Sequence, residues 1–309
     1  MKRIFIDGGA GTTGLRIVER LSVREDLTLI TLPDAVRKDT AARKEALNAC
    51  DIAFLCLPDA AAIEAVSLIE NPETVVIDTS TAHRCHPDWT YGFPELVGRD
   101  AVAASKRIAN PGCHASGFVA LVAPLVRAGL LSSDAPLTAF SLTGYSGGGK
   151  GMIADYESEG RDALLKAPRQ YGIKQTHKHL PEMAKQAGLS AYPVFSPIVA
   201  DYYSGMEVTV PLFTDMLSCE KKDAIKALAE LYRKTYTGKI VRYGEENENG
   251  FLSASCYSGS DAMSVSVYGN DERILLVSRF DNLGKGASGA AIQNMNLVLG
   301  VNETEGLVL

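Results

Sequence analysis

The chain has 309 residues, of which 46% are hydrophobic and 22% charged, and its formal net charge is −6. This composition is typical of a globular protein with one large domain or, more commonly at this length, two. The acidic balance argues against nucleic acid or an anionic membrane surface as a partner, and no apolar run is long enough to span a bilayer. Six cysteines without zinc or disulfide spacing, and no secretory signal, predict a cytoplasmic protein with free thiols and no metal site.

The N-terminal region predicts a strand over residues 2–8 and an amphipathic helix over residues 13–21. The turn between them fits G-x-G-x-x-G, the pattern that brings a pyrophosphate close to the backbone and to a helix N-terminus. An ordinary tight turn is the alternative interpretation, but the strand, turn and helix follow one another as the fingerprint requires. The residues that we expect to contact a dinucleotide here are Gly9, Gly11, Thr12, Thr13 and Gly14.

The next strand, predicted over residues 27–32, leads into a short charged segment. Asp34 lies where an acid for the cofactor ribose is expected, but Arg37 and Lys38 follow it at once. A basic pair at this position suits a 2′-phosphate, so NADP is favoured over NAD. A solvated charged loop is the alternative.

Residues 51–58 are a continuous apolar run, typical of a parallel strand that is buried on both faces. A helix is predicted over residues 59–70, and the next strand over residues 74–80. This alternation indicates a doubly wound, Rossmann-like domain. The polar and aromatic segment 81–95 predicts an irregular loop at the sheet edge that binds ligands in such folds. Arg84 is the candidate there for a phosphate or carboxylate contact, with a plain surface arginine as the alternative.

Asn110-Pro111-Gly112-Cys113 separates a short apolar run from the long apolar segment 118–126. Proline and glycine punctuate the chain just before the cysteine, so we expect Cys113 where a loop enters a helix. Unpaired amides and the helix dipole favour a thiolate there, and the thiolate is the nucleophilic form of cysteine. The alternative is a small buried apolar side chain.

Residues 144–151 nearly match a P-loop after a strand predicted over 137–144, but Gly151 replaces the Ser or Thr that binds magnesium. We therefore expect a flexible glycine loop near a cofactor, followed by a helix over 152–166. Further on, Pro181 places His179 just before a helix, where it is the candidate general acid and base for Cys113. His177 is the alternative.

The remaining strands are predicted in a block, which indicates an α+β domain with a mostly antiparallel sheet. A charged helix is predicted among them over residues 218–235. The expected strands cover residues 192–199, 206–213, 240–243, 262–268 and 273–279.

Taken together, these motifs resemble N-acetyl-gamma-glutamyl-phosphate reductases of arginine biosynthesis, in the shorter form of that family. The segments that carry the resemblance are the glycine turn at 9–14, Asn110 to Cys113, Gly144 to Gly147, His177 to Glu182 and Asp281 to Gly289. The related aspartate-semialdehyde dehydrogenases carry a glutamine after the cysteine, where this chain has His114.

The resemblance implies NADPH-dependent reduction of an acyl phosphate through a thioester on Cys113, with His179 as acid and base. It implies that Asn282, Ser146 and Gly147 lie against the nicotinamide, and that the last helix, from about Leu283, returns to the cofactor domain. Arg84 and Glu182 are the candidate substrate contacts; Glu182 alternatively orients His179 or caps its helix. A homo-oligomer is expected from the resemblance alone.

The predicted organisation is an NADP-binding domain over residues 1–112 and 283–309, and a catalytic and oligomerisation domain over residues 113–282. Three other functions stay open on the sequence. They are reduction of an aspartate-type acyl phosphate, NADPH sensing without chemistry, and hydrolysis by a cysteine–histidine pair.

Overall fold

The computed structural model describes residues 1–309, and these divide into two compact units. The first unit comprises Met1–Gly112 and Ala287–Leu307, and the second comprises Cys113–Gly286 with the last two residues. No helix in either unit is long and apolar enough to cross a membrane.

The first unit is built on a six-stranded parallel sheet with the strand order β2-β1-β3-β4-β6-β5. Its strands are β1 (Lys2–Asp7), β2 (Leu27–Ile30), β3 (Ile52–Leu55), β4 (Val75–Asp78), β5 (Thr90–Tyr91) and β6 (Arg107–Ala109). Its helices are α1 (Thr12–Leu21), α2 (Thr40–Ala49), α3 (Asp59–Ser67), α4 (Pro94–Val97), α5 (Arg99–Ala103) and α10 (Gly289–Leu299).

Side chains that alternate along each strand fill two separate apolar layers, one on either face of this sheet. On β1, Ile4 packs in the layer that also holds residues of α1 and α10, whereas Phe5 packs in the layer formed with α2 and α3. On β3, Phe54 and Leu55 divide in the same way. The continuous apolar runs in the sequence therefore arise because both faces of the parallel sheet are covered by helices.

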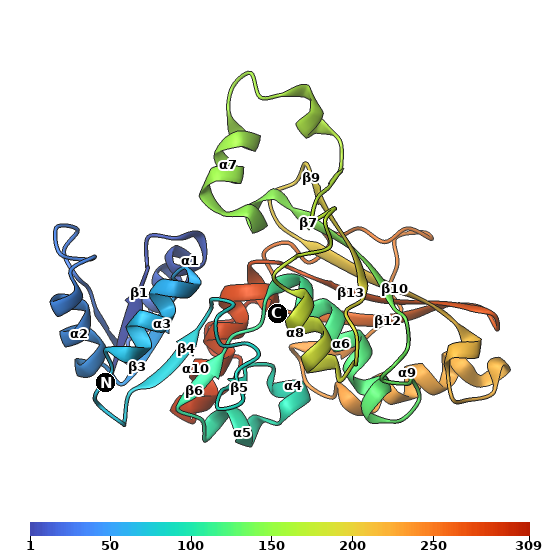
Figure 1. The fold of residues 1–309 in the computed structure, drawn as a ribbon, viewed down its shortest axis with the longest axis horizontal. Helices are drawn as coiled ribbons and strands as arrows, with labels where there is room; N and C mark the ends of the chain where they lie inside the picture. Colours follow the sequence, from blue (N-terminus) through green and yellow to red (C-terminus); the bar gives the residue numbers. More distant parts are fainter. The chain divides into compact units, whose positions relative to one another are not determined.

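The second unit contains a seven-stranded sheet with the order β11-β12-β13-β10-β7-β9-β8. Its strands are β7 (Thr138–Gly144), β8 (Arg169–Gln170), β9 (Val194–Ala200), β10 (Met206–Phe213), β11 (Val241–Tyr243), β12 (Met263–Gly269) and β13 (Arg273–Phe280). Its helices are α6 (Cys113–Arg127), α7 (Gly149–Glu157), α8 (Leu180–Ala187) and α9 (Ala224–Thr235). Figure 1 shows α7 and the segment after it standing beyond one end of β7 and β9.

This sheet is mixed, so the prediction of a mostly antiparallel sheet is not confirmed. β7 pairs parallel with β9, and β11 pairs parallel with β12. A parallel pair needs a long crossover between its strands, and the segment from β7 to β9 supplies one because it contains α7 and α8. The sequence pattern shows where strands form, but it does not show which of them pair through such crossovers.

Several predicted elements also differ locally. Helix α2 was not predicted, and segment 81–95, predicted to be irregular, includes β5 and starts α4. The expected flexible loop over 144–151 is instead a 3₁₀ turn, Tyr145–Gly148, followed directly by α7. The last helix is preceded by a π-helical turn, Gly284–Ser288, and α10 belongs to the first unit.

Candidate functional site

The glycine turn joins β1 to α1 in the first unit. Gly8 has a φ of +84°, and a Cβ added there would lie 2.3 Å from the carbonyl oxygen of Cys56. A Cβ on Gly14 would lie 2.6 Å from the carbonyl oxygen of Gly8. Gly9 has room for a Cβ, since its nearest neighbour would be the Cγ2 of Val18 at 3.4 Å. The fold therefore requires glycine at Gly8, which the fingerprint pattern missed, and at Gly14.

Helix α1 begins at Thr12 with Gly11 as its N-cap, and no side chain caps it. No acidic residue occupies its first turn, which includes Thr13, and the hydroxyl oxygen of Thr12 is buried without a partner in the protein. Unpaired amides, the positive end of the helix dipole and an orphan hydroxyl together suit an anionic ligand such as a pyrophosphate.

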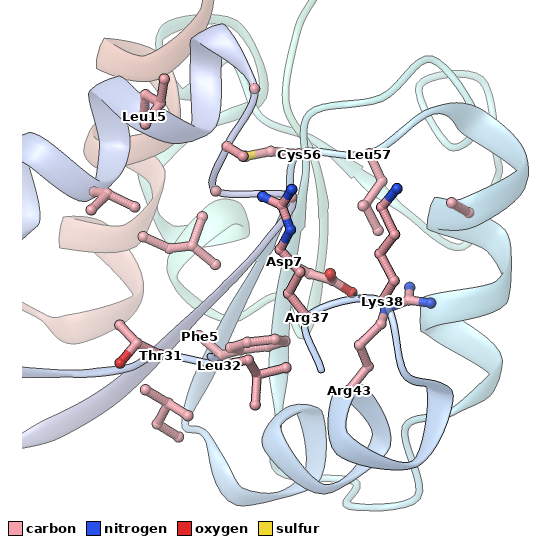
Figure 2. Close-up of a pocket in the computed structure, with 18 of the residues that line it drawn as sticks. Phe5, Asp7, Leu15, Thr31, Leu32, Arg37, Lys38, Arg43, Cys56 and Leu57 are labelled. Atoms are coloured by element: carbon pink, nitrogen blue, oxygen red, sulfur yellow. Dashed lines mark hydrogen bonds and ion pairs between the residues drawn. The ribbon is translucent and has the colours of Figure 1, made fainter. Parts of the chain in front are cut away.

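A cavity of about 730 Å³ lies beside this turn. Its wall includes Gly9 and Gly11 from the turn and Asp34, Arg37 and Lys38 from the segment after β2. Figure 2 shows basic side chains gathered on the side of the cavity where Asp7 lies. The structure thus brings the predicted turn and the predicted basic pair to one cavity, large enough for part of a dinucleotide.

Asp34, the expected ribose acid, is almost fully exposed, and its carboxylate lies 3.6 Å from the guanidinium of Arg37. An exposed pair of this kind contributes little to stability. The pair is therefore free to rearrange around a ligand.

Arg43, on the unpredicted helix α2, also lines the cavity and is 6% exposed. Its Nε donates to Asp7 at 3.0 Å, and its Nη1 donates to Glu64 at 2.8 Å. Its Nη2 is buried and has no partner in the protein. Burial raises the pKa of Asp7, and the neighbouring Arg43 offsets part of that rise.

Arg84 is buried, and two of its guanidinium nitrogens donate to backbone carbonyl oxygens. Its Nε donates to the carbonyl oxygen of Asn110 at 2.9 Å, and its Nη2 donates to the carbonyl oxygen of Thr79 at 2.8 Å. The amide of Asn110 in turn donates to the carbonyl oxygen of Asp78 at 2.7 Å. Arg84 therefore holds the segment that leads to Cys113 against the end of β4.

Cys113, in the second unit, is the first residue of α6, as the sequence predicts. It forms no disulfide, and the residue is half-buried. Helix α6 is fixed on the sheet by Gly117, where a Cβ would lie 2.5 Å from the Cγ2 of Val208 on β10. A Cβ on Gly286 would lie 3.0 Å from that of Cys113, so the π-helical turn also comes close to the cysteine.

His179 is the N-cap residue of α8, with proline in the first turn, as predicted from Pro181. It is 5% exposed, and its amide donates to the Nδ1 of His177 at 3.1 Å. Because this nitrogen accepts a hydrogen bond, His177 is unprotonated there. Burial lowers the pKa of His177 to about 4, and Lys178 adds to the effect. The ring of His177 thus accepts a hydrogen bond at the start of α8 and stays neutral at pH 7. This favours His179 over His177 as the acid and base.

His114 connects the cysteine to these histidines. Its Nδ1 lies 2.7 Å from the hydroxyl of Ser141, and its Nε2 lies 2.7 Å from the hydroxyl of Tyr171. Its ring centroid is 5.7 Å from that of His179. Burial lowers the pKa of His114 to about 3, so the ring is neutral at pH 7. The pKa of Tyr171 is raised by burial and then by the charge of Cys113, which places Cys113 within electrostatic range of this cluster.

The sequence singled out His114 only as a departure from related enzymes, and it did not single out Tyr171. No pattern along the chain joins these residues, since His114 lies on α6, Tyr171 directly follows β8, and His177 and His179 precede α8. Glu182 is buried in the first turn of α8, three residues after His179.

The three residues expected near the nicotinamide lie together in the second unit. The side-chain amide of Asn282 donates to the hydroxyl of Ser146 at 3.0 Å and accepts from the amide of Gly205 at 2.9 Å. A Cβ on Gly147 would lie 3.5 Å from the same amide nitrogen of Asn282. The structure therefore joins residues that are more than 130 positions apart in the sequence.

Two family models match the chain. The semialdehyde dehydrogenase dimerisation domain matches residues 113–282, and the semialdehyde dehydrogenase NAD-binding domain matches residues 30–105. Among solved structures, aspartate semialdehyde dehydrogenase II from Vibrio cholerae aligns with a TM-score of 0.72 at 18% identity, over 97% of this chain and 98% of that one. An aspartate semialdehyde dehydrogenase from Francisella tularensis aligns with a TM-score of 0.71 at 14% identity, over 97% and 100%. At these identities the likeness shows the fold alone.

Sequence relatives are much closer. The N-acetyl-gamma-glutamyl-phosphate reductase of Burkholderia ambifaria is 47% identical over 96% of both chains. A protein of Pseudomonas putida with the same name, numbered 2, is 45% identical over 98% of both, and one of Mesorhizobium japonicum is 46% identical over 97% of this chain and 99% of its own. By its nearly full-length identity to these reductases, this chain belongs to the N-acetyl-gamma-glutamyl-phosphate reductase family.

Proposed function

We propose that this protein reduces N-acetyl-gamma-glutamyl phosphate to N-acetylglutamate 5-semialdehyde and phosphate, in arginine biosynthesis. The observation that carries the proposal is the 47% identity, over 96% of both chains, to a reductase of that name. Cys113 lies at the start of α6, and its charge acts on the pKa of the nearby Tyr171. This position supports acyl-transfer chemistry at Cys113.

The cofactor is a nicotinamide dinucleotide, as the matching NAD-binding model indicates. We propose NADP in particular, because Arg37 and Lys38 line the same cavity as the glycine turn and suit a 2′-phosphate. The steric need for glycine at position 14 and the orphan hydroxyl of Thr12 support pyrophosphate binding by this turn, with Gly9, Gly11 and Thr13 beside it. When bound, the reduced cofactor supplies the hydride.

In the reaction, the thiolate of Cys113 attacks the carbonyl carbon of the acyl phosphate, and the carbon–oxygen bond to phosphate breaks. This leaves a thioester on Cys113 and divides one hard reduction into two easier steps. We assign a share of the oxyanion charge at each step to the amides in the first turn of α6, which begins at Cys113. After the carbonyl carbon is reduced, His179 gives its proton to the oxyanion. His179 takes the proton back as the carbon–sulfur bond breaks, so that the aldehyde leaves and the thiolate reforms.

The remaining assignments follow the same proposal. Ser146, Gly147 and Asn282 contact the nicotinamide, and their mutual contacts support one preformed surface for it. Arg84 and Glu182 are the proposed substrate contacts, although the bonds from Arg84 to the carbonyl oxygens of Thr79 and Asn110 support a positioning role more directly. We propose residues 1–112 and 283–309 as the NADP-binding domain and residues 113–282 as the catalytic domain. The dimerisation model that matches the latter supports a homo-oligomer.

The test is NADPH formation from N-acetylglutamate 5-semialdehyde, phosphate and NADP, followed by absorbance. The proposal predicts a phosphate-dependent signal that Cys113→Ser abolishes. A signal with aspartate semialdehyde but none with the acetylated substrate would keep the chemistry and overturn the substrate. Turnover without any dinucleotide would instead indicate hydrolysis, and silence with both aldehydes would contradict the proposal as a whole.

A further inference from the structure

Arg43 is a buried cation whose hydrogen bonds leave one donor unused. Two of its three nitrogens reach carboxylates on different elements, Asp7 at the end of β1 and Glu64 on α3. These bonds fix the plane of the guanidinium, because the fork geometry allows little rotation once two arms are held. The third nitrogen, Nη2, is buried and has no partner in the protein.

A buried donor without an acceptor is destabilising, so such groups usually mark a missing partner. A ligand in the neighbouring cavity can supply the acceptor, since Arg43 and the glycine turn line the same cavity. Lys44, the next residue on α2, pairs with Glu70 on the surface and does not line the cavity. On α2, the unpaired donor therefore belongs to Arg43 and not to its neighbour Lys44.

Arg43 shares the cavity with Arg37 and Lys38, which lie in the segment between β2 and α2. In Figure 2 all three basic side chains lie on the side of the cavity where Asp7 is found. Arg37 and Lys38 supply positive charge on exposed side chains, whereas Arg43 supplies a donor that is already oriented. Phosphate oxygens are the acceptors that best match such a combination.

We propose that the Nη2 of Arg43 donates a hydrogen bond to the phosphate on the adenine ribose of the cofactor, so that Arg43 determines the preference for NADP. The inference rests on the proposed function, because it assumes that the cavity receives the adenosine end of a dinucleotide. Asp7 and Glu64 are then positioning residues that hold the guanidinium plane before the cofactor arrives. This fixed donor adds specificity at little entropic cost, since the side chain is ordered in advance.

The experiment measures binding of two probes, 2′,5′-ADP and 5′-ADP, to the full-length protein by titration calorimetry. Arg43→Lys keeps a positive charge beside Asp7 and Glu64 but removes the forked donor. We expect it to weaken 2′,5′-ADP roughly tenfold and 5′-ADP by less than about threefold, the loss typical of one hydrogen bond to a charged group. Arg43→Met should weaken 2′,5′-ADP further, and Lys44→Met, the matched control, should change neither affinity.

Thermal unfolding of each variant shows whether it is folded, and Arg43→Lys carries the test if Arg43→Met does not fold. Equal losses for both probes in folded Arg43→Lys, or no loss for either, would overturn the role of Arg43. If the unmodified protein binds 5′-ADP as tightly as 2′,5′-ADP, the choice of NADP fails instead. The two failures are therefore distinguishable, since the second appears before any substitution is made.

Discussion

Replacing Gly14 by alanine tests the packing of the glycine turn. The new Cβ would lie 2.6 Å from the carbonyl oxygen of Gly8, and an ordinary contact begins near 3.4 Å, so helix and turn must separate by about 0.8 Å. The two atoms nearest the new Cβ are the carbonyl oxygen of Gly8 and the Cα of Gly9, which both belong to the backbone, so no neighbouring side chain can rotate away to make room. Overpacking of this kind costs about 1–3 kcal/mol, and the better helix propensity of alanine returns about 1 kcal/mol. We expect a net loss of up to about 2 kcal/mol.

The matched variant is Gly9→Ala, where the nearest neighbour of the added Cβ is a side-chain methyl at 3.4 Å. It should leave the free energy of unfolding within about 0.5 kcal/mol of the original, as open sites usually do. Its NADPH affinity should still fall, because the proposed function places the pyrophosphate against Gly9. Urea unfolding and NADPH fluorescence titration measure the two effects separately. Unchanged stability and NADPH affinity in Gly14→Ala, or equal loss of stability in both variants, would refute the reasoning.

Three further predictions concern the second unit. His179→Asn should lower turnover by about a hundredfold or more, the range for a lost acid and base, while the fold is kept; near-normal turnover would transfer the role to His177. Iodoacetamide at pH 7 should label Cys113 before Cys50 and Cys56, because burial raises the pKa of those two thiols to about 12, and peptide mapping that finds either of them labelled first would contradict this. The free energy of unfolding should fall as the pH drops below about 6.5, the ordinary histidine pKa. His114 and His177 then bind protons in the unfolded chain, whereas in the folded protein their pKa values are about 3 and about 4. The loss is about 1.4 kcal/mol per histidine at pH 5.5, and urea unfolding of His114→Gln should show a smaller loss between pH 7.5 and 5.5.

Features that depend on neighbours along the chain were predicted well. The start of α6 at Cys113 follows from the proline and glycine before it, and the placement of His179 at the start of α8 follows from Pro181. The strand at Met206–Phe213 matches its predicted bounds because every second residue is apolar and buried. In each case the local sequence alone determines the geometry.

Features that depend on contacts between distant segments were missed. Helix α2 has a charged sequence with few apolar residues, so no amphipathic pattern marks it, and Arg43 went unnoticed with it. Gly8 is required because β3 approaches from 48 positions away, at the carbonyl of Cys56. The mixed second sheet has the same origin, because crossover connections and not strand patterns decide which strands run parallel.

The central claim is that Cys113 carries the acyl group as a thioester that phosphate then releases. The most direct measurement mixes the protein with N-acetylglutamate 5-semialdehyde and NADP without phosphate, and records NADPH formed per active site. The account predicts a burst of about one equivalent, an acyl adduct on the Cys113 peptide by mass spectrometry, and continued turnover once phosphate is added. Sustained turnover without phosphate, or a burst that persists in Cys113→Ser, would contradict it.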